Sequence, residues 1–412
     1  MRGLWIARAL PFPLDTGDRI YSARLIRAVA DAGADLTVVG FAPAPASAVP
    51  ENWPVRWRLV DGEPHGTARA LFSTMPLVGA AHATSSYRRL VHELAQEQWD
   101  FVVFDQYGMG WAMDEFQSHR VSGKAPVLVH VAHDHEASVY KSLVRGFQGS
   151  IFKRAGIWQN WLKTRAIERH IARTVDLVTA ITDEDAKLFA IDAPHTGSVV
   201  LTPGYVGAVS KRSSIGLEVP RNVIMVGNYK WVAKSENLRQ FVAAADAAFY
   251  DAGITLHVVG SMAESLANEL RQNTRATVLH GFVDDVGPHF ANARIGVVPE
   301  EIGGGFKLKF LDYFFGRVAV ASLTHATAGL PEEIRSAMIC SPDIPSLVKA
   351  IVTQIDDTET LSNMQTNALA AAQTRYRWED RGHDLLEAIR RVANVPVGRS
   401  AEPLHVPERA MS

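Results

Sequence analysis

The sequence predicts an α/β protein built from two doubly wound units, each a parallel sheet covered by helices. At 412 residues the chain is long enough for two ordinary domains, each with its own core. Short apolar segments of strand length alternate with segments of helical periodicity, first before residue 202 and again after residue 221. A stretch rich in Gly, Pro and Ser, residues 203–220, separates the two series and predicts a linker.

Composition and charge narrow the class of protein. Hydrophobic content of 47% and charged content of 21% are typical of a soluble globular protein. The net charge of −2 gives no overall attraction to nucleic acid, so no nucleic acid partner is expected. A single cysteine, Cys340, excludes an internal disulfide framework and suits a reducing compartment. The apolar run Gly3–Ala7 is too short for a signal peptide, and no stretch approaches the roughly 20 apolar residues of a membrane span. A cytoplasmic location is therefore expected.

The first series opens with a strand over Leu4–Ala7, a loop containing Gly17, a helix over Asp18–Ala32 and a strand over Leu36–Phe41. A strand, a helix and a strand at this spacing predict a right-handed βαβ unit and a parallel sheet. Further strands of this unit are predicted over 101–105, 127–132, 176–181 and 199–200, with a helix over 87–96.

The pattern restarts after the linker. Strands are predicted over 223–226, 255–259, 277–280, 294–298 and 318–322, and helices over 236–250, 263–271, 344–354 and 359–374. A final helix is predicted over 382–393, and the residues after Val395 are rich in Pro and charge, which predicts a disordered tail.

One stretch, Val297–Gly329, contains the elements of an anion site. An apolar strand ends at Pro299, three glycines follow at Gly303 to Gly305, and a predicted helix then carries Lys307, Lys309 and Asp312. Unsatisfied N–H groups and the positive end of a helix dipole attract a phosphate, and glycine permits its close approach. The glycines fit neither the Walker A pattern nor G-x-G-x-x-G, and an ordinary strand–helix connection remains an alternative.

Taken whole, this stretch resembles a motif of the retaining glycosyltransferases of family 4, which have the GT-B fold. That motif runs from an apolar strand through Pro, Gly-Gly-Gly, a basic pair, Leu-Glu and Gly to a second strand. Leu311-Asp312, Gly316 and Val318–Ser322 complete it here. Val226-Gly227, Gly281-Phe282-Val283 and the tryptophan of Arg377-Trp378-Glu379 also match the family, so the resemblance runs from Leu4 to about Ala393.

The resemblance implies a GT-B fold of two Rossmann-like domains that face each other across a cleft, with a C-terminal helix crossing back to the first domain. The implied divisions are an acceptor-side domain over 1–202, the linker over 203–220, a nucleotide-sugar-binding domain over 221–376, the crossover helix over 377–394 and the tail over 395–412.

The resemblance also implies which residues hold the donor. Its phosphates would contact Gly303, Gly304, Gly305, Phe306, Lys309 and Lys230, together with Gly17 from the first domain, where only one of the family's two glycines is present. Asp312 would accept hydrogen bonds from two ribose hydroxyls, in place of the family's longer glutamate. Gly281, Phe282 and Val283 would lie at the base. The family's more widespread form has a glutamate for the sugar where Gly304 stands, so this chain does not reveal the sugar.

A second cluster, His133-Asp134-His135-Glu136, follows the predicted strand 127–132. Strand carboxyl ends in open α/β sheets are where ligands bind, which favours a functional role. A loop-forming or capping cluster and a metal site remain alternatives, although adjacent residues converge poorly on one ion. In the resembled family a His, often His-Asp, reaches the transferred sugar from this place, which implies catalytic roles for His133 and Asp134.

Two further segments have competing interpretations. Thr182-Asp183-Glu184-Asp185 contains a D-x-D sequence, but Thr182 three residues before Asp185 is better explained as a helix cap. Residues 141–173 carry eight Lys/Arg against one acid, Glu168, with aromatic residues between them. They form either a peripheral contact with an anionic membrane or a solvated helix face over an ordinary core stripe.

The function that the resemblance implies is transfer of a sugar from a nucleotide-diphosphate sugar, such as a UDP- or GDP-sugar, with retention at the anomeric carbon. The acceptor would be a glycan or lipid-linked intermediate of surface polysaccharide or glycoconjugate synthesis. Lysines and a helix dipole would replace a metal, so we expect neither metal nor cofactor. Two alternatives remain open: another GT-B enzyme such as a nucleotide-sugar 2-epimerase, and a non-catalytic scaffold in polysaccharide assembly.

Overall fold

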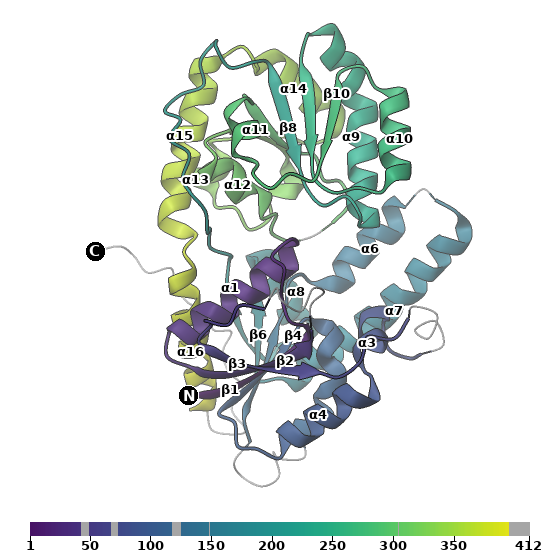
Figure 1. Ribbon diagram of the computed structural model, residues 1–412, viewed down its shortest axis with the longest axis vertical. Helices are drawn as coiled ribbons and strands as arrows, with labels where there is room; N and C mark the ends of the chain where they lie inside the picture. Colours follow the sequence, from purple (N-terminus) through teal and green to yellow (C-terminus); the bar gives the residue numbers. More distant parts are fainter. Residues whose placement is uncertain (43–48, 67–72, 118–124, 148, 304, 395–412) are drawn as a thin grey trace. The chain divides into compact units, whose positions relative to one another are not determined.

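The computed structural model describes residues 1–394 apart from 43–48, 67–72, 118–124, 148 and 304 (Figure 1). The described residues form two compact units. Residues 1–144, 149–203 and 378–394 make up the first, and residues 145–147 with 204–377 make up the second. The chain therefore returns to the first unit with its last helix.

A seven-stranded parallel sheet forms the centre of the first unit, in the order β3-β2-β1-β4-β5-β6-β7. The chain runs outward from β1 to β3 and then continues on the other side of β1 with β4, so the strand order reverses between β1 and β4. Open α/β sheets bind ligands beyond the carboxyl ends of the strands at such a reversal. The strands are β1 (Arg2–Ala9), β2 (Asp35–Phe41), β3 (Val55–Val60), β4 (Phe101–Asp105), β5 (Val127–Val131), β6 (Leu177–Ala180) and β7 (Gly197–Val200).

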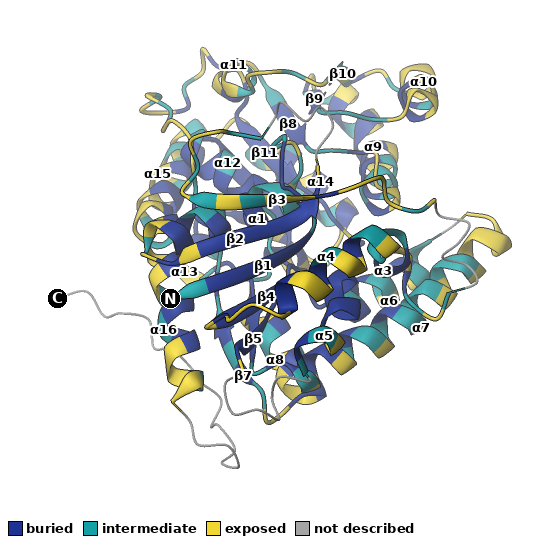
Figure 2. Ribbon diagram, turned by 60° about the horizontal axis from the view of Figure 1, so that its bottom comes forward, coloured by how far each residue is buried: buried dark blue, intermediate teal, exposed yellow. Residues whose placement is uncertain are grey.

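The central strands of this sheet are apolar along their length because they lie inside the unit. Strands β4 and β5 are buried at every residue (Figure 2), as expected for a parallel sheet that is covered on both faces. Helix α8 begins with the predicted cap, in which Thr182 Oγ1 accepts a hydrogen bond from the Asp185 N–H at 3.0 Å. The helices are α1 (Gly17–Asp31), α3 (Leu77–His82), α4 (Ser85–Ala95), α5 (Asp114–Gln117), α6 (Glu136–Gly146), α7 (Ile151–Thr174), α8 (Asp183–Asp192), α16 (Trp378–Ala393) and the 3₁₀ helix η2 (Tyr107–Ala112).

The second unit repeats this plan with a six-stranded parallel sheet, in the order β10-β9-β8-β11-β12-β13. Here the order reverses between β8 and β11. The strands are β8 (Asn222–Val226), β9 (Thr255–Val259), β10 (Thr277–Gly281), β11 (Ile295–Val298), β12 (Ala319–Leu323) and β13 (Ile339–Ser341). The helices are α9 (Val232–Asp251), α10 (Glu264–Asn273), α11 (Gly287–Ala291), α12 (Lys309–Phe315), α13 (Glu332–Arg335), α14 (Ile344–Gln354), α15 (Thr358–Arg375) and the 3₁₀ helix η4 (Thr324–Thr327). The prediction of two doubly wound Rossmann-like units is confirmed.

Two edge strands were not predicted from the sequence. Strand β3 reads VRWRLV and exposes three of its six residues. Its two arginines interrupt the apolar run on which the prediction of a strand relied. Strand β13 has only three residues, which is too few for a periodic signal. Among the described residues, no helix is both long enough and apolar enough to pass through a membrane.

The last helix, α16, packs closely against α1 in the first unit, as the resemblance implies. Gly382 makes this approach possible, because a Cβ added there would lie only 2.0 Å from the carbonyl oxygen of Ala28. Arg381 fixes the start of the helix by donating from Nε to the carbonyl oxygen of Thr202 at 2.7 Å and from Nη2 to its Oγ1 at 3.0 Å.

We expect Gly382→Ala to destabilise the protein by about 1–3 kcal/mol, because the added methyl group must push α16 away from the α1 backbone. The measurement is the free energy of unfolding in urea. Gly156→Ala in α7 is the matched control, since a Cβ there would meet no atom within 4 Å and replacing a helical glycine stabilises by roughly 0.5–1 kcal/mol. Equal stability of the two variants would contradict the close packing of α16.

Candidate active site

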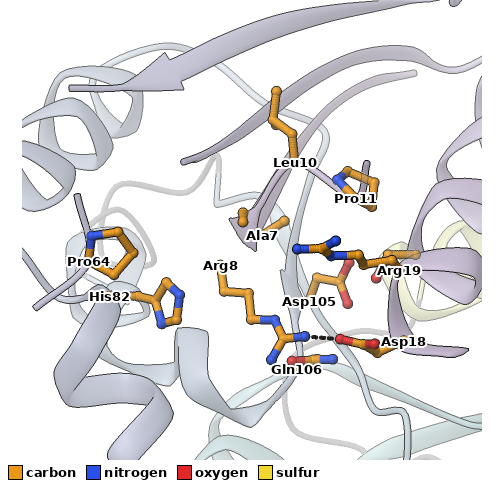
Figure 3. Close-up of a pocket in the computed structure, with 12 residues that line it drawn as sticks. Ala7, Arg8, Leu10, Pro11, Asp18, Arg19, Pro64, His82, Asp105 and Gln106 are labelled. Carbon is orange, nitrogen blue, oxygen red and sulfur yellow. Dashed lines mark ion pairs between the residues drawn. The ribbon is translucent and has the colours of Figure 1, made fainter. Parts of the chain in front are cut away.

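A cavity of about 390 Å³ lies at the carboxyl ends of the strands beside the order reversal of the first sheet. Its walls come from the end of β1, the loop after it, the start of α1 and the end of β4, as Figure 3 shows. The lining residues that carry charge or a polar group are Arg8, Asp18, Arg19, Ser22, His82, Asp105 and Gln106. Such a mixture of donors and acceptors is suited to a ligand with many hydroxyl groups.

The two arginines of this cavity are each held by an acid. Arg8 forms an ion pair with Asp18, and Arg19 Nη1 lies 2.9 Å from Asp15 Oδ1. Burial lowers the pKa of Arg8, and the nearby Asp105 carboxylate partly offsets this effect. Each arginine of the cavity therefore has a carboxylate partner beside its guanidinium.

Asp105 and His133 form a buried pair next to the cavity. His133 Nε2 lies 2.8 Å from Asp105 Oδ1, and Trp5 Nε1 donates to Asp105 Oδ2 at 2.9 Å. The amide nitrogen of Gln106 lies 3.2 Å from His133 Nδ1. Because that amide can only donate, Nδ1 accepts and the proton of the neutral ring sits on Nε2, toward Asp105. The ring is thus held in one orientation and one tautomer.

The charge of Asp105 is stabilised by these contacts. Burial alone would raise its pKa, but the His133 imidazole and the hydrogen bonds from Trp5 and Ser22 bring the pKa of Asp105 below its ordinary value. The next residue, Gln106, has a φ of 72°, a backbone conformation that non-glycine residues rarely adopt. Among the described residues, Asp105 and Gln106 line the cavity whereas His133 lies behind them, only 8% exposed.

The other residues of the predicted His-Asp-His-Glu cluster serve partly structural roles. His135 Nδ1 lies 2.7 Å from Ser138 Oγ and its Nε2 lies 3.3 Å from Asp192 Oδ2. Glu168 accepts hydrogen bonds from the N–H groups of Glu136 and Ala137 and so caps α6, and burial raises the pKa of Glu168 to about 8. Asp134 is half-buried beside His133. In the described parts of the chain, no group of three or more His, Cys, Asp or Glu side chains is arranged to hold a metal ion.

The second unit holds a buried ion pair in the loop and helix that follow β11. Lys309 Nζ lies 2.8 Å from Glu300 Oε1, and the two side chains are only 7% and 4% exposed. Burial alone would raise the pKa of Glu300, but Lys309, Lys234 and Lys307 lower it to about 2. The sequence suggested Lys309 as a phosphate contact and did not reveal its pairing with Glu300. Helix α12 begins at Lys309, so Lys307 lies in the loop and not in the predicted helix.

The glycine loop after β11 adopts a backbone conformation that requires glycine. Gly303 and Gly305 have φ values of 134° and 61°, in the left-handed region that other residues avoid. Gly304 lies outside the described residues. Asn237 of α9 holds the start of the loop, because its Oδ1 accepts from the Ile302 N–H at 2.8 Å and its Nδ2 donates to the Ile302 carbonyl oxygen at 2.7 Å. Phe306 is half-buried, with its ring 5.5 Å from that of Tyr376.

Asp312, the predicted ribose-binding residue, lies in the first turn of α12. It is half-buried on α12, and burial raises its pKa to about 6, an effect that Lys309 partly offsets. The following residue, Tyr313, anchors the helix to the sheet, since its hydroxyl accepts from the Val226 N–H of β8 at 3.0 Å. The position of Asp312 is therefore fixed relative to the switch point between β8 and β11.

The remaining predicted donor residues also follow strands of the second sheet. Lys230 lies exposed after β8, and Gly281 ends β10 with a φ of 71°. Phe282 is 69% exposed and Val283 is half-buried. Because all strands of this sheet are parallel, the segments after β8, β10 and β11 lie along the same edge. Gly17, His133 and Asp134 belong instead to the first unit, where Gly17 begins α1.

Sequence reasoning missed Arg8, Asp105, Gln106, Asn237 and Glu300. A signal existed for Asp105, which was already recognised as the end of a strand, so the rule applied to His133 would have selected it too. Nothing in the sequence marks Asn237, because it lies far along the chain from the loop that it holds.

We expect Lys309→Met to cost about 3–5 kcal/mol at pH 7, because it leaves the buried Glu300 carboxylate without a partner. The contribution of the pair is fully present above about pH 4.5, the ordinary pKa of a glutamate, and is lost as the pH falls toward 2, where folded Glu300 takes up its proton. The measurement is urea unfolding at several pH values. The control is the double variant Glu300→Gln/Lys309→Met, which should recover most of the loss. A double variant as unstable as the single one would show that the pairing is not the cause.

Comparisons with known proteins agree with this fold. Residues 220–357 match the family model described as glycosyl transferases group 1. No curated protein matches the chain. Among solved structures, Anabaena Alr3699/HepE in complex with UDP has a TM-score of 0.65 at 13% identity, covering 95% of this chain and 100% of that one. WaaG, a glycosyltransferase involved in lipopolysaccharide biosynthesis, has a TM-score of 0.62 at 16% identity, covering 93% and 99%.

The α,α-trehalose 6-phosphate synthase of Burkholderia multivorans has a TM-score of 0.62 at 11% identity, covering 95% of this chain and 97% of that one. At these identities the likeness shows a shared fold. The family match within the second unit and the GT-B fold of the two units support a glycosyltransferase.

Proposed function

We propose that the protein transfers a sugar from a nucleoside-diphosphate sugar to an acceptor hydroxyl, with the donor bound along the carboxyl edge of the second sheet. The observation that carries this proposal is the segment after β11. There the left-handed glycines Gly303 and Gly305 precede Lys309 and Asp312 of α12, beside the strand-order reversal. HepE, which shares the fold, has been solved with UDP and with UDP-glucose, which supports a UDP-sugar or a related donor.

In this proposal the protein lowers the barrier mainly by electrostatics. When the glycosidic bond to the donor breaks, negative charge develops on the leaving diphosphate, and fixed N–H groups and ammonium groups aimed at it stabilise the transition state. An ammonium has three N–H donors, and the hydrogen bond from Lys309 to Glu300 uses one of them. The exposed Lys230 and the half-buried Lys307 add further positive charge along the same edge.

Asp312 would accept hydrogen bonds from the ribose hydroxyls, and the backbone of Gly281 to Val283 would face the base. For the transferred sugar, the assignment of His133 and Asp134 rests on the resemblance. The contacts of His133 support a positioned role, because Asp105 and Gln106 hold both ring nitrogens. The family 4 resemblance further implies retention of the anomeric configuration.

Lysines at the donor edge supply the positive charge that a metal ion supplies in other transferases, so we propose a reaction that needs neither metal nor cofactor. The proposed acceptor is a glycan or lipid-linked intermediate of surface polysaccharide or glycoconjugate synthesis. A cytoplasmic enzyme with such an acceptor would work at the inner face of the membrane, in contact with it through residues 141–173.

A thermal-shift panel of nucleoside diphosphates and nucleotide sugars tests this function. Ligand at 100 times its dissociation constant stabilises the folded state by about 2.7 kcal/mol, so we expect a clear rise in Tm with UDP or GDP. His133→Ala should keep this rise and lose transfer activity, because His133 belongs to the unit that does not hold the nucleotide.

The alternatives give different results. A scaffold protein would show no rise with any nucleotide and no activity to lose. An epimerase would convert the nucleotide sugar without an acceptor, which analysis of the products would detect. Either result would overturn the proposal.

The pKa of Asp312 gives the proposal a pH dependence. Because its pKa is raised to about 6, the carboxylate that accepts two hydroxyl hydrogen bonds is present above pH 6 and is mostly lost below it. We expect the affinity for the nucleoside diphosphate to fall by roughly tenfold between pH 7 and pH 5, following the ionised fraction. Isothermal titration calorimetry at several pH values measures this.

Asp312→Asn is the matched control, because it cannot ionise and binds the same ligand. It should bind more weakly at pH 7 and lack the part of the pH dependence that belongs to the protein. Titration of the ligand's own phosphate appears equally in both proteins and cancels in the comparison. Identical pH profiles would show that Asp312 does not contact the donor.

A further inference from the structure

We infer that the amino-terminal half of α7 is a docking surface for an anionic lipid bilayer, in which Ile151 and Phe152 insert between the lipids. This inference deepens the proposed function, because it gives residues and a lipid class to the membrane contact named there. The membrane contact does not depend on the transfer reaction, because vesicle binding and nucleotide binding are measured in separate experiments.

An apolar stripe runs along the exposed side of α7. Ile151, Ala155, Trp158 and Leu162 are spaced by four, three and four residues, which places them on one face of a helix. All four are exposed, and Phe152 adjoins them. With 90% and 83% of their surfaces exposed, Phe152 and Ile151 are the two most exposed large apolar side chains in the described part of the chain.

The start of this helix stands clear of the unit that carries it. Residues 151–155 are all exposed (Figure 2), whereas the buried residues of α7 begin at Thr164. The tip is nevertheless an ordered helix end, because Ser150 Oγ accepts a hydrogen bond from the Lys153 N–H at 3.4 Å. The stripe is therefore not the edge of a core, and the helix presents it in a defined conformation.

The charge around the stripe is strongly positive in a chain whose net charge is only −2. Residues 141–173 carry eight Lys/Arg and a single acid, Glu168. Glu168 is buried and hydrogen-bonded to backbone N–H groups, so it does not neutralise the surface. Arg169 pairs with Asp192, but it lies beyond the stripe toward the other end of α7. Lys153 and Arg154, which follow Phe152 directly, are both exposed. When Ile151 and Phe152 insert among the acyl chains, Lys153 and Arg154 would lie at the level of the anionic headgroups.

An anionic bilayer fits this surface better than a second copy of the chain. A symmetric dimer through the stripe would bring the two positively charged segments together, and like charges at an interface disfavour association. A helix that lies in a membrane interface typically combines an apolar stripe containing Trp, Phe or Leu with Lys and Arg beside it. Trp158, half exposed, is suited to the headgroup level, where its ring and its N–H both find partners.

Co-sedimentation with vesicles tests the inference. We expect the full chain to bind phosphatidylcholine vesicles that contain phosphatidylglycerol and to bind pure phosphatidylcholine vesicles much more weakly. Ile151→Ser/Phe152→Ser should reduce binding to the anionic vesicles by about tenfold or more, because it removes the apolar surface that inserts. Lys153→Gln/Arg154→Gln should weaken binding and make it less sensitive to salt.

Ile191→Ser and Leu217→Ser are matched controls, since these side chains are 75% and 76% exposed and lie outside α7. They should bind vesicles like the unchanged protein. All variants should have the Tm of the unchanged protein and the same rise in Tm with nucleotide. The rise with nucleotide tests the proposed function independently of vesicle binding.

Three results would overturn the inference: no binding to anionic vesicles, binding that the α7 variants do not reduce, or equal binding to both kinds of vesicle. Light scattering detects the competing occupant. A dimer that Ile151→Ser/Phe152→Ser dissociates, without vesicle binding, would assign the stripe to a second copy of the chain.

Discussion

The direction of parallel strands is the constraint on which both candidate sites depend. Because right-handed crossovers return the chain to the start of each new strand, the carboxyl ends of all strands in a parallel sheet lie along the same edge. Where the strand order reverses, the two neighbouring connections leave in opposite directions, and a gap remains that side chains or a ligand must fill. In this protein the gap lies between β1 and β4 in the first unit and between β8 and β11 in the second. Asp105 and Gln106 lie at the first of these places and Glu300 and Lys309 at the second, whereas Gly281 to Val283 follow the edge strand β10.

Each unit fills its gap with a buried carboxylate that has a basic partner. Asp105 is the last residue of β4 and pairs with His133, and Glu300 follows β11 by two residues and pairs with Lys309. Strands β4 and β11 occupy equivalent positions, each beside the first strand of its sheet and across the reversal. A buried charge is tolerated only when it is paired and hydrogen-bonded, so each carboxylate fixes the side chain that the sequence had singled out as functional.

The fold was predictable because the sequence patterns that specify strands and helices are local. Most of the side-chain pairings at the two sites join segments that lie far apart in the sequence, so they were not predictable. Alternating strand and helix periodicities specify two doubly wound units, and the elements that escaped them include the polar edge strand β3, the three-residue β13 and the short helices α3, α5, α11 and α13. Lys309 and Asp312 could be predicted as site residues because they lie within one contiguous motif. The partners of His133 come from segments 27 and 28 residues earlier in the chain, and Asn237 lies 65 residues before the loop that it holds. Such contacts depend on tertiary placement, which no spacing in the sequence records.

The pairing of Lys309 with Glu300 also bears on how the proposed reaction would be driven. A free lysine at the donor edge would bind the ground-state diphosphate strongly, and binding substrate and transition state equally well does not raise the rate of the chemical step. With Glu300 holding the ammonium, much of its charge is already compensated before the donor arrives. In the proposed reaction, its attraction for the diphosphate would grow as the glycosidic bond breaks and the leaving oxygen becomes more negative. In the proposed reaction the pair would therefore weaken the ground-state contact of Lys309 with the diphosphate and hold its ammonium in a position that is set before the donor binds.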